Sequence, residues 1–332
     1  MRKISYLMIM LMIGFVAISC SKDDEEKVEE EEIDSSIIAK GTCGENIDWV
    51  LDRDSVLTIS GTGKMTDYID MADPWYPHKT DIKAIKIEQG VTSIGNCAFS
   101  DCSSMTSIEI PNTVASIGSG AFVGCSALTS ITIPNSVTDI GVYAFSGCSG
   151  LTAIEIPQSV TNIENMAFAG CTGLTSVTIP KSVTKFGTRV FIECDKLAEL
   201  IVEDGNRNYD SRNNCNAIIE TASNTLMAGC MNTSIPNTVS TIEFGAFWGC
   251  DGMNAIKIPS SVSDIKSLAF FDCRSLKSIS VAWETPLNVP DDIFNSVPKA
   301  KCTLYVPNGT SNAYQSAKVW NEFQNIEEYP VK

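Results

Sequence analysis

Apolar and polar residues alternate along most of the chain in a 23-residue unit. A representative unit runs from Leu151 to Gly173 and reads LTAIEIPQSVTNIENMAFAGCTG. Leu151, Ile154 and Ile156 are apolar, and the alternation of the last two predicts a short strand with one buried face. Pro157 ends this strand, because proline has no N–H to donate to a continuing sheet.

The second half of the unit has a different pattern. Val160 and Ile163 predict another short stretch that faces inward. Ala167, Phe168 and Cys171 then stand at helical spacing, which predicts a leg formed by one helical or 3₁₀ turn. No unit can bury its apolar side alone, so neighbouring units must stack and share one continuous core.

Three residue types recur with the same 23-residue step. The sequence shows the step in Cys102, Cys125, Cys148, Cys171, Cys194, Cys250 and Cys273, in Phe99, Phe122, Phe145, Phe168, Phe191, Phe247 and Phe270, and in Pro111, Pro134, Pro157, Pro180, Pro236 and Pro259. Such self-similarity is the signature of a solenoid, and 23 residues lie in the range of leucine-rich repeats. We therefore predict one elongated body instead of the two domains that 332 residues would suggest.

The repeats divide the body into segments. Regular repeats occupy residues 82–202 and 230–282, and between them residues 203–229 form an irregular repeat with ten inserted residues. In this segment two apolar stretches, 216–219 and 225–228, predict a β-hairpin. Insertions in solenoids form loops that are often functional, but a structural role is an equal alternative.

Both ends of the solenoid need caps, because an open end exposes core and strand edges. Residues 41–81 lack the repeat and contain two apolar runs, 49–51 and 56–59, which predict a capping hairpin. Residues 283–332 hold a last repeat and an amphipathic stretch, 312–323, which predicts a short helix.

The repeat unit Leu-x-x-Ile-x-Ile-Pro-x-Ser-Val-Thr-x-Ile-x-x-x-Ala-Phe-x-x-Cys resembles the BspA-type leucine-rich repeat of bacterial surface proteins. Residues 41–76 are also similar to segments that precede such repeats, so the resemblance covers residues 41–332. It implies a right-handed α/β solenoid of short parallel strands and short helical or 3₁₀ legs, with a β-rich N-terminal cap and a small helical C-terminal cap. It also implies adhesion to host proteins or other cells, with no shared catalytic residues.

The N-terminus predicts export and a lipid anchor. Residues 4–18 form an apolar run that is short for a membrane span but typical of a signal peptide, after the basic Arg2 and Lys3. Ala17-Ile18-Ser19-Cys20 resembles a bacterial lipobox, with Ala17 in place of the usual Leu. We predict a signal peptide over residues 1–19 and lipidation of Cys20; the alternative is an ordinary cleaved signal with an incidental cysteine.

Residues 20–40 predict an acidic, flexible tether. From Lys22 to Asp34 there are nine acidic and two basic residues, and such a block of like charge extends in solution. The stretch from Ser21 to Glu26 resembles the acidic export signal of Bacteroides-type surface lipoproteins. We expect a lipid-anchored outer-membrane protein exposed on the cell surface; the alternative is a plain tether on a protein that faces the periplasm.

Composition narrows the possible chemistry. The net charge of −16 argues against nucleic acid as a partner, because nucleic-acid binders neutralise phosphates with Lys and Arg. The only histidine, His78, lies in a predicted loop, and no catalytic or nucleotide-binding motif occurs. We predict no enzyme activity, no cofactor and no metal site.

The cysteines predict a buried ladder of small side chains, because side chains that point the same way cannot form a row of disulfides. Cys215 and Cys230 are an exception. If the hairpin turns about Ala222 and Ser223, these two cysteines lie opposite each other, which would allow a disulfide; free thiols are the alternative.

Two surfaces are candidate binding sites. One outward column of the predicted strands holds Glu109, Thr132, Glu155 and Thr178, on a regular and mildly polar face. The position after each repeat Phe holds, among others, Val123, Ile192, Trp248 and Phe271. Large aromatic residues there indicate a contact patch, although they could equally shield the irregular repeat.

The predicted function is non-catalytic binding or adhesion at the cell surface, through contacts along the solenoid with a protein or glycan on host or neighbouring cells. One alternative is a carbohydrate-binding accessory lipoprotein of a glycan-uptake system. That alternative requires an exposed aromatic platform, and the strand columns contain no aromatic residue. Another alternative is a structural envelope protein without a soluble ligand.

Overall fold

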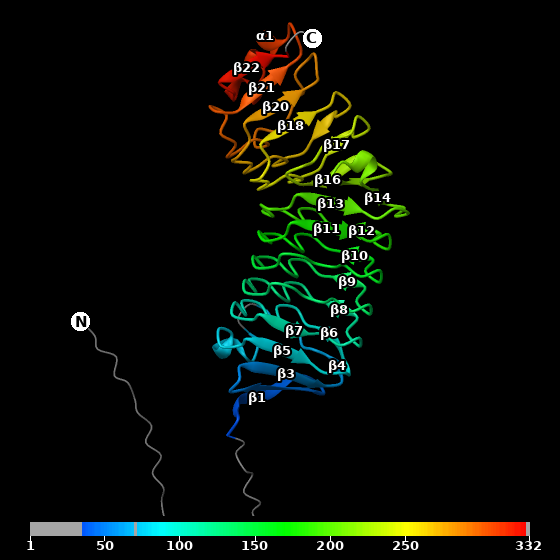
Figure 1. Ribbon diagram of the computed structural model, residues 1–332, viewed down its shortest axis with the longest axis vertical. Helices are drawn as coiled ribbons and strands as arrows, with labels where there is room; N and C mark the ends of the chain where they lie inside the picture. Colours follow the sequence, from blue (N-terminus) through cyan, green and yellow to red (C-terminus); the bar gives the residue numbers. More distant parts are fainter. Residues whose placement is uncertain (1–34, 70–71, 330–332) are drawn as a thin grey trace, which may run out of the picture. The chain divides into compact units, whose positions relative to one another are not determined.

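The computed structural model describes residues 35–69 and 72–329 (Figure 1). The predicted signal peptide and the predicted lipidation at Cys20 lie outside these residues. Ser36–Lys332 is clustered as one compact unit, and its described part winds into about eleven turns. No helix in the described ranges is both long and apolar enough to cross a membrane.

Each regular turn contributes short strands to two sides of the solenoid. The first side consists of β1 (Ile37–Gly44), β2 (Ile47–Asp52), β3 (Val56–Gly61), β5 (Ala84–Ile87), β7 (Ser107–Glu109), β11 (Ser176–Ile179), β13 (Glu199–Val202), β18 (Ala255–Ile258), β20 (Ser278–Val281), β21 (Thr303–Val306) and β22 (Asn325–Glu328). Between β7 and β11 the first side continues with one bridge, Thr132 to Glu155.

The second side follows the proline of each regular turn. It consists of β4 (Gly63–Lys64), β6 (Val91–Ile94), β8 (Ser116–Ile117), β9 (Asp139–Ile140), β10 (Asn162–Ile163), β12 (Lys185–Phe186), β14 (Tyr209–Asp210), β15 (Ala217–Glu220), β16 (Thr225–Gly229), β17 (Thr241–Ile242) and β19 (Asp264–Ile265). The regular repeats pair in parallel with a constant offset of 23 residues; Asn162, for example, pairs with Asp139 and with Lys185. The repeat period of the sequence is therefore the register of the sheets.

The legs are not helical, and this part of the α/β prediction is wrong. Met166 and Gly170 flank the leg at φ angles of 56° and 69°, in the left-handed region that interrupts a helix. The N–H of Phe168 donates to the carbonyl of Val190 in the next turn at 3.0 Å, where a helix would use a carbonyl of its own turn. The legs are turns that hydrogen bond from one repeat to the next. The helical segments of the described residues lie elsewhere: η1 (Tyr76–His78), η2 (Arg212–Asn214), α1 (Ser311–Ser316) and η3 (Trp320–Glu322).

Columns of identical side chains fill the core. Phe122, Phe145 and Phe168 are fully buried, and their rings stack at centroid distances of 5.2 and 5.4 Å. The thiol of Cys171 donates to the carbonyl of Phe145 at 3.2 Å, and Cys148 repeats this contact with Phe122 at 3.1 Å. The ladder of buried, unbridged thiols is confirmed.

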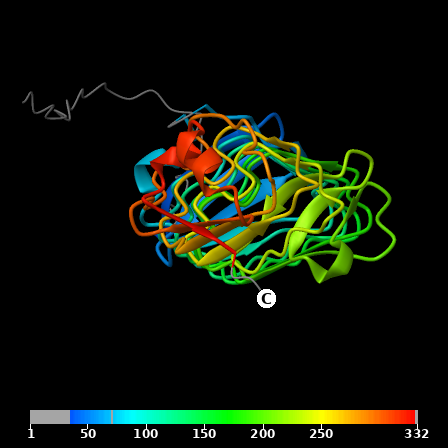
Figure 2. The ribbon, with the colours of Figure 1, turned by 90° about the horizontal axis from the view of Figure 1, so that it is seen from above.

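The irregular repeat contains a hairpin of β15 and β16, where the sequence predicts one. Figure 2, viewed along the solenoid, shows this yellow-green segment projecting beyond the outline of the other turns. A register shift between Ile218 and Ile219 moves the pairing by one residue, so Cys215 and Cys230 do not fall opposite each other as the predicted register has them. Both are free thiols, and the predicted disulfide is absent.

The leg is omitted from the irregular repeat. The N–H of Glu193 donates to the carbonyl of Trp248 at 3.0 Å, so legs 55 residues apart in sequence stack directly. Phe247 then packs on the backbone of Gly229. A Cβ atom at Gly229 would lie 2.1 Å from Cε1 of the Phe247 ring, so only glycine fits there.

The caps differ in part from their predictions. β2 and β3 form the expected antiparallel hairpin, but β1 precedes them and begins at Ile37, inside the segment predicted as tether. At the other end, the predicted helix over 312–323 is shorter. α1 ends at Ser316, Val319 has a φ of 71° that stops the helix, and β22 then pairs with β21.

We predict that Gly229→Ala lowers the free energy of unfolding by about 3 kcal/mol, because the added methyl group overpacks the contact with Phe247. Urea unfolding followed by circular dichroism measures the change. Gly229→Ala/Phe247→Leu should recover part of the loss. An unchanged unfolding midpoint in Gly229→Ala would contradict this packing.

A second prediction concerns thiol reactivity. Burial raises the pKa of Cys148 to about 12 and that of Cys273 to about 12, so their reactive thiolate forms are scarce at pH 8. Alkylation of the folded chain, mapped by peptide mass spectrometry, should modify half-exposed Cys97 first and leave the ladder unmodified until urea is added. Equal labelling of Cys97 and Cys148 would contradict the buried ladder.

Candidate binding surface

The outward side chains of the first-side strands form one continuous surface, which we call the strand face. Parallel pairing places Lys86 beside Glu109, Thr178 beside Ile201, and Lys257 beside Ser280. All six belong to one outward column, and the neighbouring column includes Ser107, Ser176 and Glu199. Ile201 is the largest apolar side chain of the column and is 36% exposed.

A row of hollows follows the strand face from Lys86 to Ala282. In chain order their volumes are about 510, 300, 650, 390 and 470 Å³. Glu109 lines the first hollow, and Glu155 and Thr178 line the second. Three of the four residues predicted on this face therefore border a cavity. Thr132, the fourth, is exposed beside Glu155.

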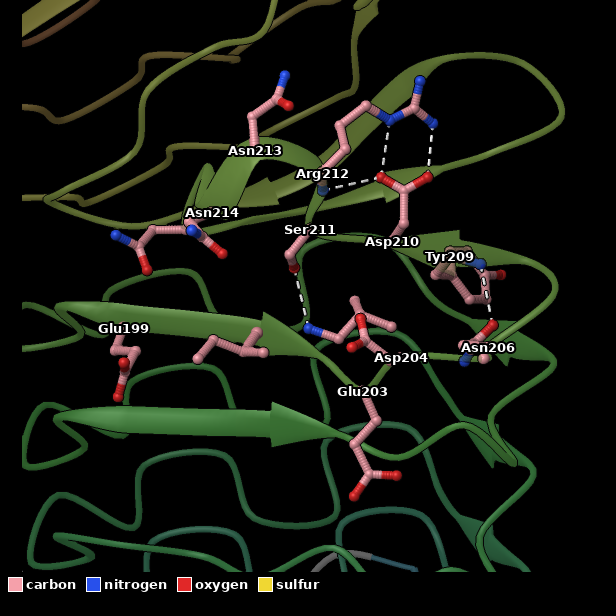
Figure 3. Close-up of a pocket in the computed structure, with 14 residues that line it drawn as sticks. Glu199, Glu203, Asp204, Asn206, Tyr209, Asp210, Ser211, Arg212, Asn213 and Asn214 are labelled. Carbon is pink, nitrogen blue, oxygen red and sulfur yellow. Dashed lines mark hydrogen bonds and ion pairs between the residues drawn. The ribbon is translucent and has the colours of Figure 1, made fainter.

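The largest hollow is built by the irregular repeat (Figure 3). β13 supplies one wall with Glu199 and Ile201, and the segment from Asp204 to Asn216 supplies the rest. Sequence analysis did not identify this cavity. The available signal was the polar stretch EDGNRNYDSRNNCN at 203–216, which interrupts the apolar repeat.

An ion pair fixes the outer wall of this hollow. Nε and Nη2 of Arg212 donate to the two carboxylate oxygens of Asp210 at 2.7 and 2.6 Å. Nη1 of the same guanidinium donates to Oδ1 of Asn224 at 2.7 Å and to Oγ1 of Thr238 at 3.3 Å. Bidentate pairing holds Arg212 in one orientation and ties the wall to the hairpin and to the following turn.

The inner wall is also held by hydrogen bonds. Oγ of Ser211 accepts the N–H of Val202 at 2.9 Å and donates to the carbonyl of Ala217 at 2.8 Å. Glu203, between the second and third hollows, accepts both Nε2 contacts from Gln158, at 2.9 and 2.7 Å, and the N–H of Lys181 at 3.1 Å. The hydrogen bonds from Gln158 and Lys181 lower the pKa of Glu203, so its carboxylate is charged at neutral pH.

The second predicted surface is packed more tightly than the strand face. Trp248 lies against a small cluster of buried Met166, Ala169 and Ile192, and its ring meets that of Phe271 edge-on at 4.7 Å. Nε1 of Trp248 is buried without an acceptor in the described structure. These contacts fit the shielding alternative for Trp248, Phe271 and Ile192. Val123 is half-buried on the same side.

The strand face offers binding groups and no catalytic arrangement that we can identify. Among the described residues, no group of three or more His, Cys, Asp or Glu side chains is placed to hold a metal ion. His78 lies in the N-terminal cap, with Nδ1 3.8 Å from Oδ2 of Asp81. The polar amides, carboxylates and one guanidinium of the hollows can hydrogen bond a partner without bond chemistry.

The comparisons with known proteins agree with this architecture. The model of the BspA type leucine rich repeat region matches residues 75–198 and 224–327, in six copies. A leucine-rich repeat protein from Eubacterium ventriosum is 22% identical, covering 87% of this chain and 85% of its own, with a TM-score of 0.56.

A leucine rich cell surface protein from Faecalibacterium prausnitzii is 24% identical, covering 89% of this chain and 96% of its own, with a TM-score of 0.55. At these identities both structures support the fold alone. No curated protein matches the chain.

We predict that Trp248→Ala costs about 2 kcal/mol of unfolding free energy, because it removes a half-buried ring from the cluster with Ile192. Trp248→Phe should be close to neutral, since it keeps much of the ring and removes the unsatisfied N–H. Thermal unfolding compares the two variants. Equal stability of Trp248→Ala and the unmodified chain would show that the indole is not a packing element.

Proposed function

Because the chain belongs to the BspA-type leucine-rich-repeat family, we propose that it is a non-catalytic binding protein whose strand face holds a macromolecular partner. The observation that carries this proposal is the row of hollows along the strand face, from Lys86 to Ala282. Many contacts of moderate strength along such a row add up to stable binding when the partner is extended.

The proposed location is the outer surface of the outer membrane, with the protein anchored by lipid at Cys20 and extended by an acidic tether. Support comes from the sequence alone: the apolar run over 4–18, the lipobox-like Ala17 to Cys20 and the acidic block that follows. The Faecalibacterium prausnitzii protein of similar fold is described as a cell surface protein. On a cell surface, the function would be adhesion to host or microbial macromolecules.

The row of hollows also bears on the glycan-uptake alternative. Amide, carboxylate and guanidinium groups such as those of Asn214, Asp204 and Arg212 can hydrogen bond sugar hydroxyls. However, Tyr209 is the one aromatic residue that lines any of the five hollows, and it is 5% exposed. Without a flat aromatic platform we favour a protein partner.

The test is binding of the purified full chain to immobilised matrix and plasma proteins and, in parallel, to a polysaccharide panel. We expect saturable binding to at least one protein. Thr178→Trp/Ser280→Trp, which fills the strand face, should weaken that binding about tenfold or more. Val123→Trp on the other surface is the matched control and should leave binding unchanged.

Three results would contradict the proposal. Binding blocked by Val123→Trp and unaffected by Thr178→Trp/Ser280→Trp would place the site on the other surface. Binding to glycans alone would replace adhesion with the glycan-uptake alternative. Absence of binding on both panels would reject adhesion to matrix and plasma proteins.

A further inference from the structure

We propose that the strand face between Glu155 and Asp204 docks an extended, positively charged polypeptide segment. This inference rests on the proposed function of the strand face and identifies the chemistry of the partner. The second and third hollows adjoin there, because Glu203 lines both of them. Together they form one groove of neighbouring cavities across the turns that contain Thr178 and Ile201.

The groove presents negative charge that the protein itself leaves available. The carboxylates of Glu155, Glu199 and Asp204 make no hydrogen bond or ion pair within residues 35–69 and 72–329. All three are exposed residues. The guanidinium of Arg212 is occupied by Asp210, and Lys181 offsets part of the charge of Glu203. An incoming cation can therefore pair with these carboxylates without breaking an existing ion pair.

The floor of the groove is partly apolar. Ile201 is 36% exposed and lies beside Thr178, between the carboxylates of the two hollows. Lys and Arg combine an aliphatic stem with a charged head, so one side chain can cover Ile201 and reach a carboxylate. Simple inorganic cations have no such stem. A floor of this kind below the carboxylates favours basic side chains as the occupants.

The repeat sets the spacing of these side chains. Glu155 belongs to the turn before that of Thr178, and Glu199 belongs to the turn after it. Two turns of parallel strands separate the two carboxylates by roughly 10 Å along the solenoid. A polyproline-II segment repeats its face every three residues, over about 9.3 Å. Basic residues three positions apart therefore match Glu155 and Glu199.

The polyproline-II conformation also suits the way the partner must lie. The backbones of β11 and β13 are already paired with each other, so a segment that crosses their outward faces cannot join the sheet. A polyproline-II chain needs no partner for a hydrogen-bond ladder and is common in unfolded segments. The proposed occupant is thus an exposed, unstructured, basic part of a protein.

The test uses the full chain and fluorescent twelve-residue peptides of Pro and Ser, followed by anisotropy at low salt. A peptide with arginines at positions 5 and 8 should bind saturably, and binding should weaken as NaCl screens the charges. Glu155→Gln/Glu199→Gln should weaken it about tenfold, the size expected from losing two partly exposed charge pairs. The matched control is Glu45→Gln, in the turn between β1 and β2.

A peptide with arginines at positions 5 and 7 tests the spacing and should bind more weakly. Equal affinity of the unmodified chain and Glu155→Gln/Glu199→Gln, or no binding of either peptide, would overturn the inference. Stronger binding of cationic chitosan oligomers than of the peptide would reassign the groove to a glycan. If a protein from the matrix panel binds the strand face and ignores Glu155→Gln/Glu199→Gln, the proposed function stands and the basic partner is excluded.

Discussion

The structure depends on one constraint: no turn can bury its apolar side or satisfy its backbone except against the next turn. Every part of the repeat meets this constraint with the same 23-residue offset. Strands pair in parallel, the Phe168 N–H reaches the Val190 carbonyl, and the Cys171 thiol reaches the Phe145 carbonyl. A residue is therefore fixed by its equivalents one repeat away, and the strand face inherits the same regular spacing.

This constraint explains which features were predictable from sequence. Residues such as Phe168 and Cys171 recur because they contact their own equivalents, so their period gives the stacking, the core and the unbridged thiols. The leg was mispredicted because apolar residues at helical spacing also fit a turn, and the left-handed angles of Met166 and Gly170 carry no apolar signature.

Features of the irregular repeat were harder to predict, because no equivalent repeat constrains them. The register shift beside Ile219, which separates Cys215 from Cys230, depends on local hairpin packing. The largest hollow depends on the pairing of Arg212 with Asp210 and on Ser211, which join residues that the sequence could not bring together. The polar stretch indicated a departure from the repeat, but its cavity required three-dimensional structure.

The irregular repeat has a consequence for the shape of a partner. On the second side it adds β14, β15 and β16, whereas on the leg side Glu193 contacts Trp248 directly, with no layer between them. Extra layers on one side act as a wedge, and Figure 1 shows the turns that follow β16 inclined to those that precede β13. The strand face is consequently two flat segments that meet at an angle beside the largest hollow. A rigid, straight ligand would fit one segment, whereas a ligand that spans both must bend there.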